Sequence, residues 1–274
     1  MTDLIELIGL QRAEFEIAAT LFRKRFAAQV ALAALGAGSA AIADNKIVYW
    51  LAICSFGLFL LWVRYEIKYR AARANAERAR RATLIMGGLG KPISHTELHQ
   101  IKESMSASEK SAARLADPDY YASMSAVGPQ RLAEMLEEAA YWTSNLQKIS
   151  ETVMSGAFVA VLLVAGASFL ALIPAATPDN AMMITRIFLS VLVFSVGSDM
   201  LLTAISYRET HKVLEKIMYR IDAAKARGYP ETDLLMLLCD YNAAVEATPL
   251  SLPFAYNLRK AQLNRNWAAR RSAA

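Results

Sequence analysis

Four long apolar runs constrain the fold of this 274-residue chain more than any other feature. They cover residues 26–43, 47–63, 153–173 and 182–206, and the first three contain no Asp, Glu, Lys or Arg. About 20 apolar helical residues cross a bilayer core, with a lower limit near 17. Long core helices of a soluble protein are the alternative, but such helices are amphipathic, whereas these runs are apolar on all sides. The runs therefore predict four membrane spans.

Short connections pair these runs into two hairpins. Asp44-Asn45-Lys46 separates the first two runs, and residues 174–180, which include two helix-breaking prolines, separate the last two. The predicted fold class is all-α, an integral membrane protein with two transmembrane helical hairpins and a helical cytoplasmic bundle. Its predicted parts are an N-terminal amphipathic helix (1–25), transmembrane hairpin 1 (26–63), a cytoplasmic helical segment (64–152), transmembrane hairpin 2 (153–206) and a cytoplasmic helical tail (207–274).

Basic residues near the span ends predict the orientation. Residues 64–81 contain seven Lys or Arg, whereas the two short connections carry Lys46 and, at the edge, Arg186. Basic flanks are retained in the cytoplasm, so both termini and residues 64–152 are expected there. A cleaved signal peptide ending near Ala43 is the alternative for the first run, but 25 residues with several acidic side chains precede it. The net charge of +5 is too modest to indicate DNA or RNA as a partner.

Local patterns predict helices in the cytoplasmic parts. Apolar residues of the N-terminal segment recur at helical spacing and favour packing on other helices: Leu4, Ile8, Phe15, Ala18 and Phe22. Residues 64–81 extend the second span, with their basic side chains among lipid phosphates; a nucleotide-binding role is the alternative. Gly87–Gly90 ends this helix, Ser94 and Glu97 have capping-box spacing, and residues 117–121 form a loop.

Catalytic and metal-binding motifs are weak in this sequence. Residues 87–91 and 36–41 only partly match phosphate-binding and dinucleotide-binding glycine patterns. His95 and His99 are four residues apart but lack a third ligand nearby. Cys54 and Cys239 are too few for a disulfide framework, and we expect both to be buried as small hydrophobes. The sequence therefore predicts neither an enzyme nor a bound cofactor or metal.

Ionisable residues inside spans are costly and are candidates for function. Ser195, Asp199 and Ser206 share one helical face, which could line a pore. The alternative is that Asp199 reaches back to Arg208 or the headgroups. Arg186 lies near the outer interface, where its side chain can snorkel. Because four helices are too few to enclose a wide pore, and small residues in two spans permit close helix contact, a pore would require a homo-oligomer.

Several short motifs accompany this layout. They are Asp119-Tyr120-Tyr121-Ala122-Ser123, Gly128 with Arg131-Leu132, Glu138-Ala139-Ala140-Tyr141-Trp142, and a tail with Pro253, Tyr256, Leu263-Asn264 and Trp267. With the order hairpin, long segment, hairpin and helical tail, the chain resembles the S-4TM family of four-transmembrane effectors of bacterial antiphage defence. The resemblance covers nearly the whole chain.

The resemblance implies a cell-death effector in the bacterial inner membrane. A neighbouring nucleotidyltransferase would make a cyclic oligonucleotide during infection, and the effector would then breach the membrane. Arg pairs with phosphate and aromatic rings stack on bases, so the ligand-binding candidates are Tyr120, Tyr121, Arg131 and Trp142. Packing of the bundle explains the same aromatic residues. A regulatory or scaffolding membrane protein without a pore is the main alternative function, and a small transporter is a third.

Overall fold

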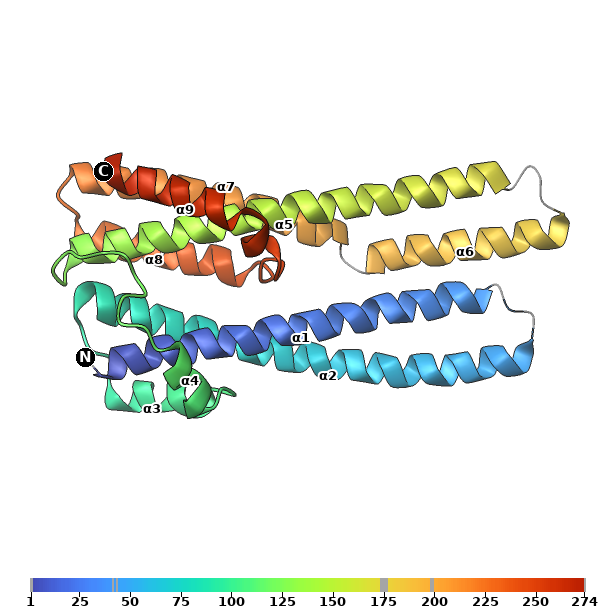
Figure 1. The fold of residues 1–274 in the computed structure, drawn as a ribbon, viewed down its shortest axis with the longest axis horizontal. Coiled ribbons are helices and arrows are strands. Elements are labelled where there is room, and N and C mark those ends of the chain that lie inside the picture. The colour runs from blue at the N-terminus through green and yellow to red at the C-terminus, as the bar shows by residue number, and fades with distance from the viewer. Residues whose placement is uncertain (1, 41, 43, 173–176, 198–199, 274) are drawn as a thin grey trace. The chain divides into compact units, whose positions relative to one another are not determined.

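The computed structural model describes residues 2–40, 42, 44–172, 177–197 and 200–273, and these contain helices and no strand. About 85% of the chain is helical, which confirms the all-α prediction. The helices are labelled in Figure 1. Their bounds are α1 Thr2–Ala40, α2 Asn45–Leu84, the π-helical turn η1 Ile85–Leu89, α3 His95–Ser104, α4 Glu109–Leu115, α5 Pro129–Leu172, α6 Pro178–Gly197, α7 Met200–Ala226, α8 Glu231–Glu246 and α9 Ala255–Ala273.

The chain divides into two compact units. Unit 1 contains Met1–Ala19, Tyr69–Ser150 and Ser206–Ala274, and unit 2 contains Thr20–Lys68 and Glu151–Ile205. Helices α1, α2, α5 and α7 each contribute residues to both units.

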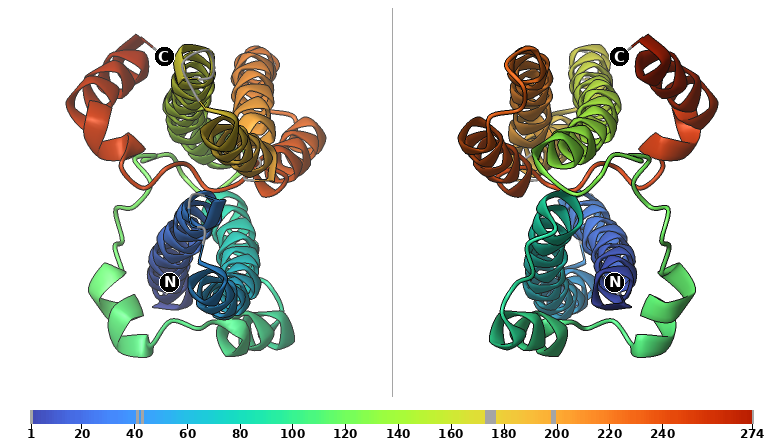
Figure 2. Two further views of the ribbon diagram at one scale, coloured as in Figure 1. Left: turned by 90° about the vertical axis from the view of Figure 1, so that its right-hand side faces the viewer. Right: turned by 90° about the vertical axis from the view of Figure 1, so that its left-hand side faces the viewer.

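Unit 1 has a conventional buried core. Its main cluster joins α5, α7 and α8, and the end of α2 contributes Leu84. A smaller cluster includes Leu7 of α1, Ala79 of α2 and Ile101 of α3, and the end-on views show α1, α2 and α3 grouped together (Figure 2). The predicted packing of the N-terminal helix is confirmed, because Ile8, Ala18 and Phe22 of the predicted apolar stripe are buried. Burial of apolar surface of this kind is the main favourable contribution to folding.

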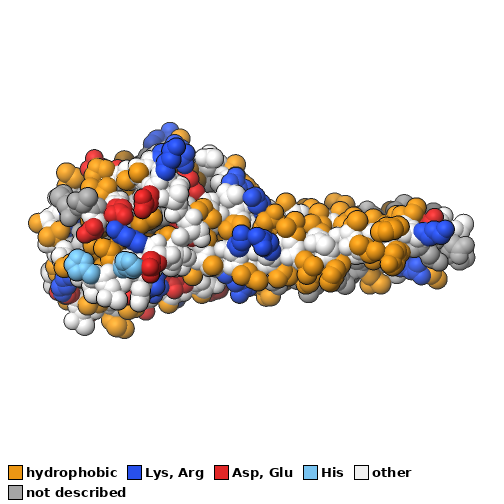
Figure 3. All heavy atoms as spheres, turned by 90° about the horizontal axis from the view of Figure 1, so that it is seen from below, with side chains coloured by type: hydrophobic (Ala, Val, Ile, Leu, Met, Phe, Trp, Pro, Cys, Tyr) orange, Lys and Arg blue, Asp and Glu red, His pale blue; other side chains and the backbone are white. Residues whose placement is uncertain are grey.

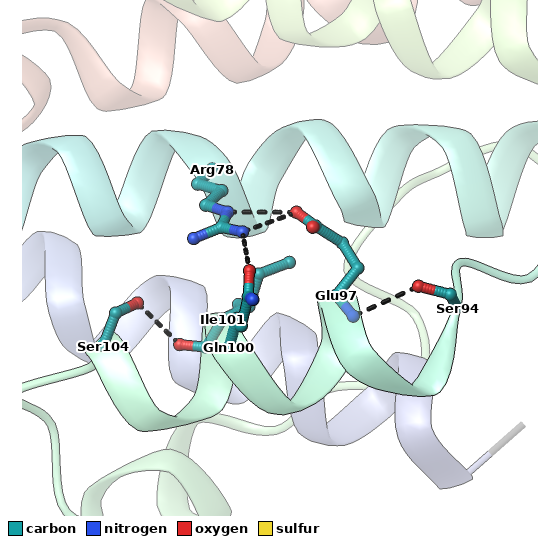
Figure 4. Close-up of polar contacts among 6 residues, drawn as sticks. All are labelled: Arg78, Ser94, Glu97, Gln100, Ile101 and Ser104. Carbon is teal, nitrogen blue, oxygen red and sulfur yellow. Dashed lines mark hydrogen bonds and ion pairs between the residues drawn. The ribbon is translucent and has the colours of Figure 1, made fainter.

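The predicted helix signals between α2 and α5 are largely confirmed. Gly90 adopts a left-handed conformation with φ of 67° after η1, which Gly does at low cost. Ser94 caps α3 by accepting a hydrogen bond of 3.2 Å from the Glu97 N–H (Figure 4). Only half of the capping box forms, because the Glu97 carboxylate binds Arg78 instead. The short helix α4 was not predicted.

The basic stretch of α2 corrects one expectation. Arg73 donates to the main-chain carbonyls of Val245 and Glu246 at the end of α8, where a cation complements the helix dipole. Arg78 binds Glu97 at 2.8 and 3.0 Å. Arg80 is buried in unit 1. The prediction that these arginines lie among lipid phosphates is therefore wrong, because protein acceptors and rings surround them.

Unit 2 exposes many of its apolar side chains and fully buries few of those that the structure describes. On α2, Trp50 and Phe56 are both 63% exposed, and on α5 Leu170 is 73% exposed. Figure 3 shows such side chains on one face of the molecule. Cys54 and Cys239 are exposed, so the prediction that they are buried is wrong. Both cysteines lie on helix faces that no other described element covers.

Among the residues that the structure describes, two helices are long and apolar enough to cross a membrane, Lys46–Leu89 and Pro129–Ala171. Core helices of soluble proteins have the same length and composition, but they are buried, whereas the apolar windows here are 0% and 6% buried. The first and fourth predicted spans include residues 41, 43, 198 and 199, which lie outside the described residues. Asn180–Val191 forms a shorter apolar helix within the fourth run.

Candidate functional site

A cavity of about 370 Å³ lies within unit 1 and is hereafter the Arg80 pocket. Its volume is near the lower end of the range of about 300–1,000 Å³ that small-molecule sites occupy. Helices α1, α2, α5, α8 and α9 and the segment between α4 and α5 contribute to its wall. Six of the lining side chains are aromatic: Phe15, Tyr120, Tyr121, Trp142, Tyr241 and Tyr256.

Arg80 is the cationic side chain of this wall and is only 8% exposed. Its guanidinium forms an ion pair with Glu77, three residues earlier on α2, a spacing that places both side chains on one helix face. It also lies 4.9 Å from the ring centroid of Tyr241 and 6.0 Å from that of Phe15. These are distances at which a cation interacts with an aromatic face. Nη2 of Arg80 is the atom that pairs with Glu77, and Nε has no hydrogen-bond partner among the described residues.

Burial sets the protonation of the groups around Arg80. Desolvation raises the pKa of the Glu77 carboxyl, although Arg80 and Arg73 oppose that change. Desolvation also raises the pKa of the Tyr120, Tyr121 and Tyr241 phenols, because burial disfavours a charged form. These phenols are therefore neutral at physiological pH and can donate hydrogen bonds.

The structure brings together three of the four predicted ligand residues. Tyr120, Tyr121 and Trp142 all line the Arg80 pocket. The ring centroids of Tyr120 and Tyr121 are 4.9 Å apart, and those of Trp142 and Tyr256 are 6.1 Å apart. Arg131 does not line this pocket, and its Nη1 donates to the Ser125 carbonyl at 3.1 Å.

Sequence reasoning missed Arg80 and Tyr241. Arg80 lies in a run of seven basic residues, which favours a role at the membrane surface when the run is read as a whole. A usable signal is the spacing of Ala72, Ala76 and Ala79, which are all buried and mark the packed face of α2. Glu77 and Arg80 adjoin that face, so they differ from the exposed members of the run.

The predicted pore residues have a different outcome. Asp199 lies outside the described residues, as does the side chain of Ser195 on α6. Ser206 is half-buried on α7. Arg186 is exposed on α6, and its Nη2 lies 3.3 Å from the sulfur of Met182. The common face predicted for Ser195, Asp199 and Ser206 therefore stays a prediction.

A second cavity in unit 1, of about 510 Å³, is more polar. Its wall includes Glu134, which accepts hydrogen bonds from Ser125 at 2.8 Å and from Gln130 at 2.9 Å. Glu138 accepts a 2.9 Å bond from the Ala122 N–H and lines both cavities. Arg270 of α9 lies over this cavity and pairs with Glu137 at 2.5 Å. The acidic groups of this cavity thus already have partners within the chain.

Within the described part of the chain, no group of three or more His, Cys, Asp or Glu side chains could hold a metal ion. His95 and His99 are exposed, and His99 lies 3.3 Å from Glu103. No family model, curated protein or solved structure matches this chain. The Arg80 pocket and the exposed apolar helices are therefore the features from which a function can be argued.

Proposed function

We propose that the chain is a multi-pass membrane protein with four spans, whose cytoplasmic helical domain senses a ligand and controls the integrity of the membrane. The observation that carries this proposal is the exposure of unit 2. Soluble monomers expose apolar patches of only a few hundred Å², and about 25 cal/mol is lost for each Å² of apolar surface left in water. A bilayer removes that cost for helices of this length and composition.

Helix continuity supplies a route for the signal. Arg80 is on α2 and Trp142 is on α5, and each of these helices also contains an apolar segment of unit 2. A ligand that binds one arrangement of unit 1 more tightly would shift the population toward that arrangement. A rigid helix that belongs to both units can carry such a shift in population from the cytoplasmic unit to the membrane.

The resemblance to S-4TM effectors completes the proposal. In it, both termini are cytoplasmic, the protein resides in the bacterial inner membrane, and a homo-oligomer forms the pore. The signal is a cyclic oligonucleotide made by a neighbouring nucleotidyltransferase during phage infection, and no catalytic step by this chain is involved. A scaffold without a pore is the second candidate, favoured by Leu235 and Met236 of unit 1, which are 38% and 57% exposed and could dock a partner.

The test is membrane potential and dye entry in bacteria that express the chain with an active or inactive cyclase. Trp142→Ala would be compared with Tyr219→Ala, an aromatic truncation in the same unit but outside the pocket. We expect depolarisation only with active cyclase, its loss in Trp142→Ala and its retention in Tyr219→Ala. An intact membrane throughout, with the protein expressed and inserted, would contradict the effector proposal and favour the scaffold.

A further inference from the structure

We propose that the Arg80 pocket takes one planar, uncharged heteroaromatic ring, and that any phosphates on the ligand stay outside the pocket. This inference rests on the proposed function, in which the pocket is the site of the signal. It specifies which part of the ligand the protein reads. Three properties of the wall carry it: its aromatic surface, its balance of charge and a buried amide.

The aromatic surface favours a flat ring. Six aromatic side chains line a cavity of about 370 Å³. They come from α1, α5, α8, α9 and the segment before α5, so they surround the space from several sides. Aromatic side chains stack on the faces of heteroaromatic rings with little regard to substituents. The small volume accommodates one ring system, whereas a whole oligonucleotide carries several.

The balance of charge disfavours phosphate. Arg80 is the one Lys or Arg among the described residues that line the cavity. Its charge is already matched by Glu77, and a second carboxylate, Glu138, is part of the wall. A ligand with several negative charges would therefore meet no unpaired positive charge on the wall. The loss of its hydration on entry would not be offset by an ion pair. A cation would meet Arg80, so an uncharged ring suits the cavity best.

Gln11 distinguishes a heteroaromatic ring from a hydrocarbon ring. Its side chain is 1% exposed and lines the cavity, and its Oε1 has no hydrogen-bond partner among the described residues. A buried acceptor without a partner lowers stability until a donor reaches it. A ring N–H or amino group would supply that donor, as nucleobases do.

The experiment measures binding to the purified full chain in lipid nanodiscs by equilibrium dialysis. The probes are adenosine and guanosine, each with its 5′-monophosphate and 5′-diphosphate. We expect at least one nucleoside to bind with an affinity within about threefold of its phosphorylated forms, since the phosphates lie outside. Affinity that rises tenfold or more with each phosphate, or no binding of either nucleoside at millimolar concentration, would overturn the inference.

Pocket variants assign the binding to this cavity. Tyr256→Ala changes a wall residue that is 38% exposed, so its fold should survive, and it should weaken nucleoside binding at least tenfold. Tyr219→Ala is the matched control and should bind as wild type. Gln11→Leu should weaken a nucleoside but not indole methylated on nitrogen, which has no N–H donor. Equal binding by Tyr256→Ala and wild type would place the ring elsewhere and refute the inference.

Failure of this inference and failure of the proposed function give different results. If cyclase-dependent depolarisation occurs but no nucleoside binds, the effector proposal stands and the assignment of ligand chemistry is wrong. If a nucleoside binds at the pocket but the membrane stays intact in all cells, the ligand assignment stands and the effector proposal is wrong.

Discussion

Both halves of α5 carry leucines, but the surroundings of these leucines are opposite. In the half that belongs to unit 1, Leu132 and Leu136 are completely buried. In the half that belongs to unit 2, Leu163 is 67% exposed and Leu170 is 73% exposed. The same residue type on one continuous helix is thus completely covered by protein in one half and mostly uncovered in the other. Since exposed leucine is costly in water, the difference supports a different solvent for the second half.

Polar residues show the complementary difference. The first half of α5 contains Glu134, Glu137 and Glu138, each bonded within unit 1. Residues 153–172 contain no charged side chain. A bilayer rejects charges but accepts apolar side chains in any direction, whereas a folded domain in water requires an apolar face and a polar face. The residues on the exposed face of a helix, rather than those on its buried face, therefore distinguish a helix in a bilayer from a helix in water.

The largest loss of stability is expected from a substitution in the buried half of α5. Leu136→Ala should lower the free energy of unfolding by about 2–5 kcal/mol, because it leaves a cavity in a packed core. Leu163→Ala removes the same atoms from a position that the proposed function places in lipid, and it should cost less than about 1 kcal/mol. The measurement is denaturant unfolding of the purified chain in detergent. Equal losses in the two variants would show that Leu163 is packed against protein in the functional assembly.

A charge in the exposed half tests the solvent directly. Leu163→Arg places a guanidinium within the predicted third span and should oppose insertion by about 2.5–3.5 kcal/mol. In water, the same change at an exposed position would be nearly neutral. The readout is the fraction of protein recovered with membranes after alkaline carbonate extraction, with Leu163→Ala as the control. A soluble, folded Leu163→Arg protein obtained in the same yield as wild type would refute the membrane assignment.

Glu134 and Glu138, one helical turn apart on α5, allow a second comparison within unit 1, between two carboxyl groups whose pKa values shift in opposite directions. Burial acts to raise the pKa of Glu134, but hydrogen bonds from Ser123, Gln130 and Ser125 outweigh it and lower that pKa. Burial raises the pKa of Glu138, although the Ala122 N–H opposes it. Glu134→Gln should therefore cost about 1–2 kcal/mol at pH 7 through weaker hydrogen bonds, and Glu138→Gln should be neutral or slightly stabilising.

The pH dependence of these two variants has opposite signs. The stabilisation from Glu134 is complete above the ordinary carboxyl pKa of about 4.3 and is lost as pH falls through its lower folded pKa. The cost of Glu134→Gln should thus shrink between pH 5 and pH 3. The contribution of the Glu138 carboxyl is complete below about pH 4.3 and is lost as pH rises through its higher folded pKa. Thermal unfolding from pH 3 to 7 measures both, and parallel profiles would contradict the assignment.

Much of the fold could be predicted from the sequence because helical signals are local. Residues 64–81 continue the helix of the second apolar run as predicted, Gly90 follows its end, and Ser94 caps the next helix. The helix α4 was missed because its seven residues carry no apolar stripe of useful length.

The candidate site was harder to predict because its residues come together only in the tertiary structure. Adjacent tyrosines and a tryptophan, Tyr120, Tyr121 and Trp142, could be singled out by residue type. Tyr241 comes from a helix more than 90 residues later, and no local pattern links it to Arg80. Arg131 was chosen because it adjoins a motif, but its guanidinium binds a nearby carbonyl instead. Residue type is enough to single out the aromatic side chains, whereas only the tertiary packing shows which arginine lies beside them.

The last prediction concerns the start of α3, where removal of the exposed N-cap residue should lower stability less than a substitution in the core. Ser94→Ala removes the acceptor for the Glu97 N–H and should cost about 1 kcal/mol, as loss of a helix N-cap commonly does. Ser94→Asp retains an acceptor and places a negative charge at the helix N-terminus, so it should preserve stability. Thermal unfolding measures both variants. Since Arg78 also holds Glu97, Ser94→Ala combined with Arg78→Ala should cost less than the sum of the two single variants if the two contacts support each other, because each single variant then already weakens the other contact. A strictly additive result would show that the Ser94 cap and the Arg78 contact act independently.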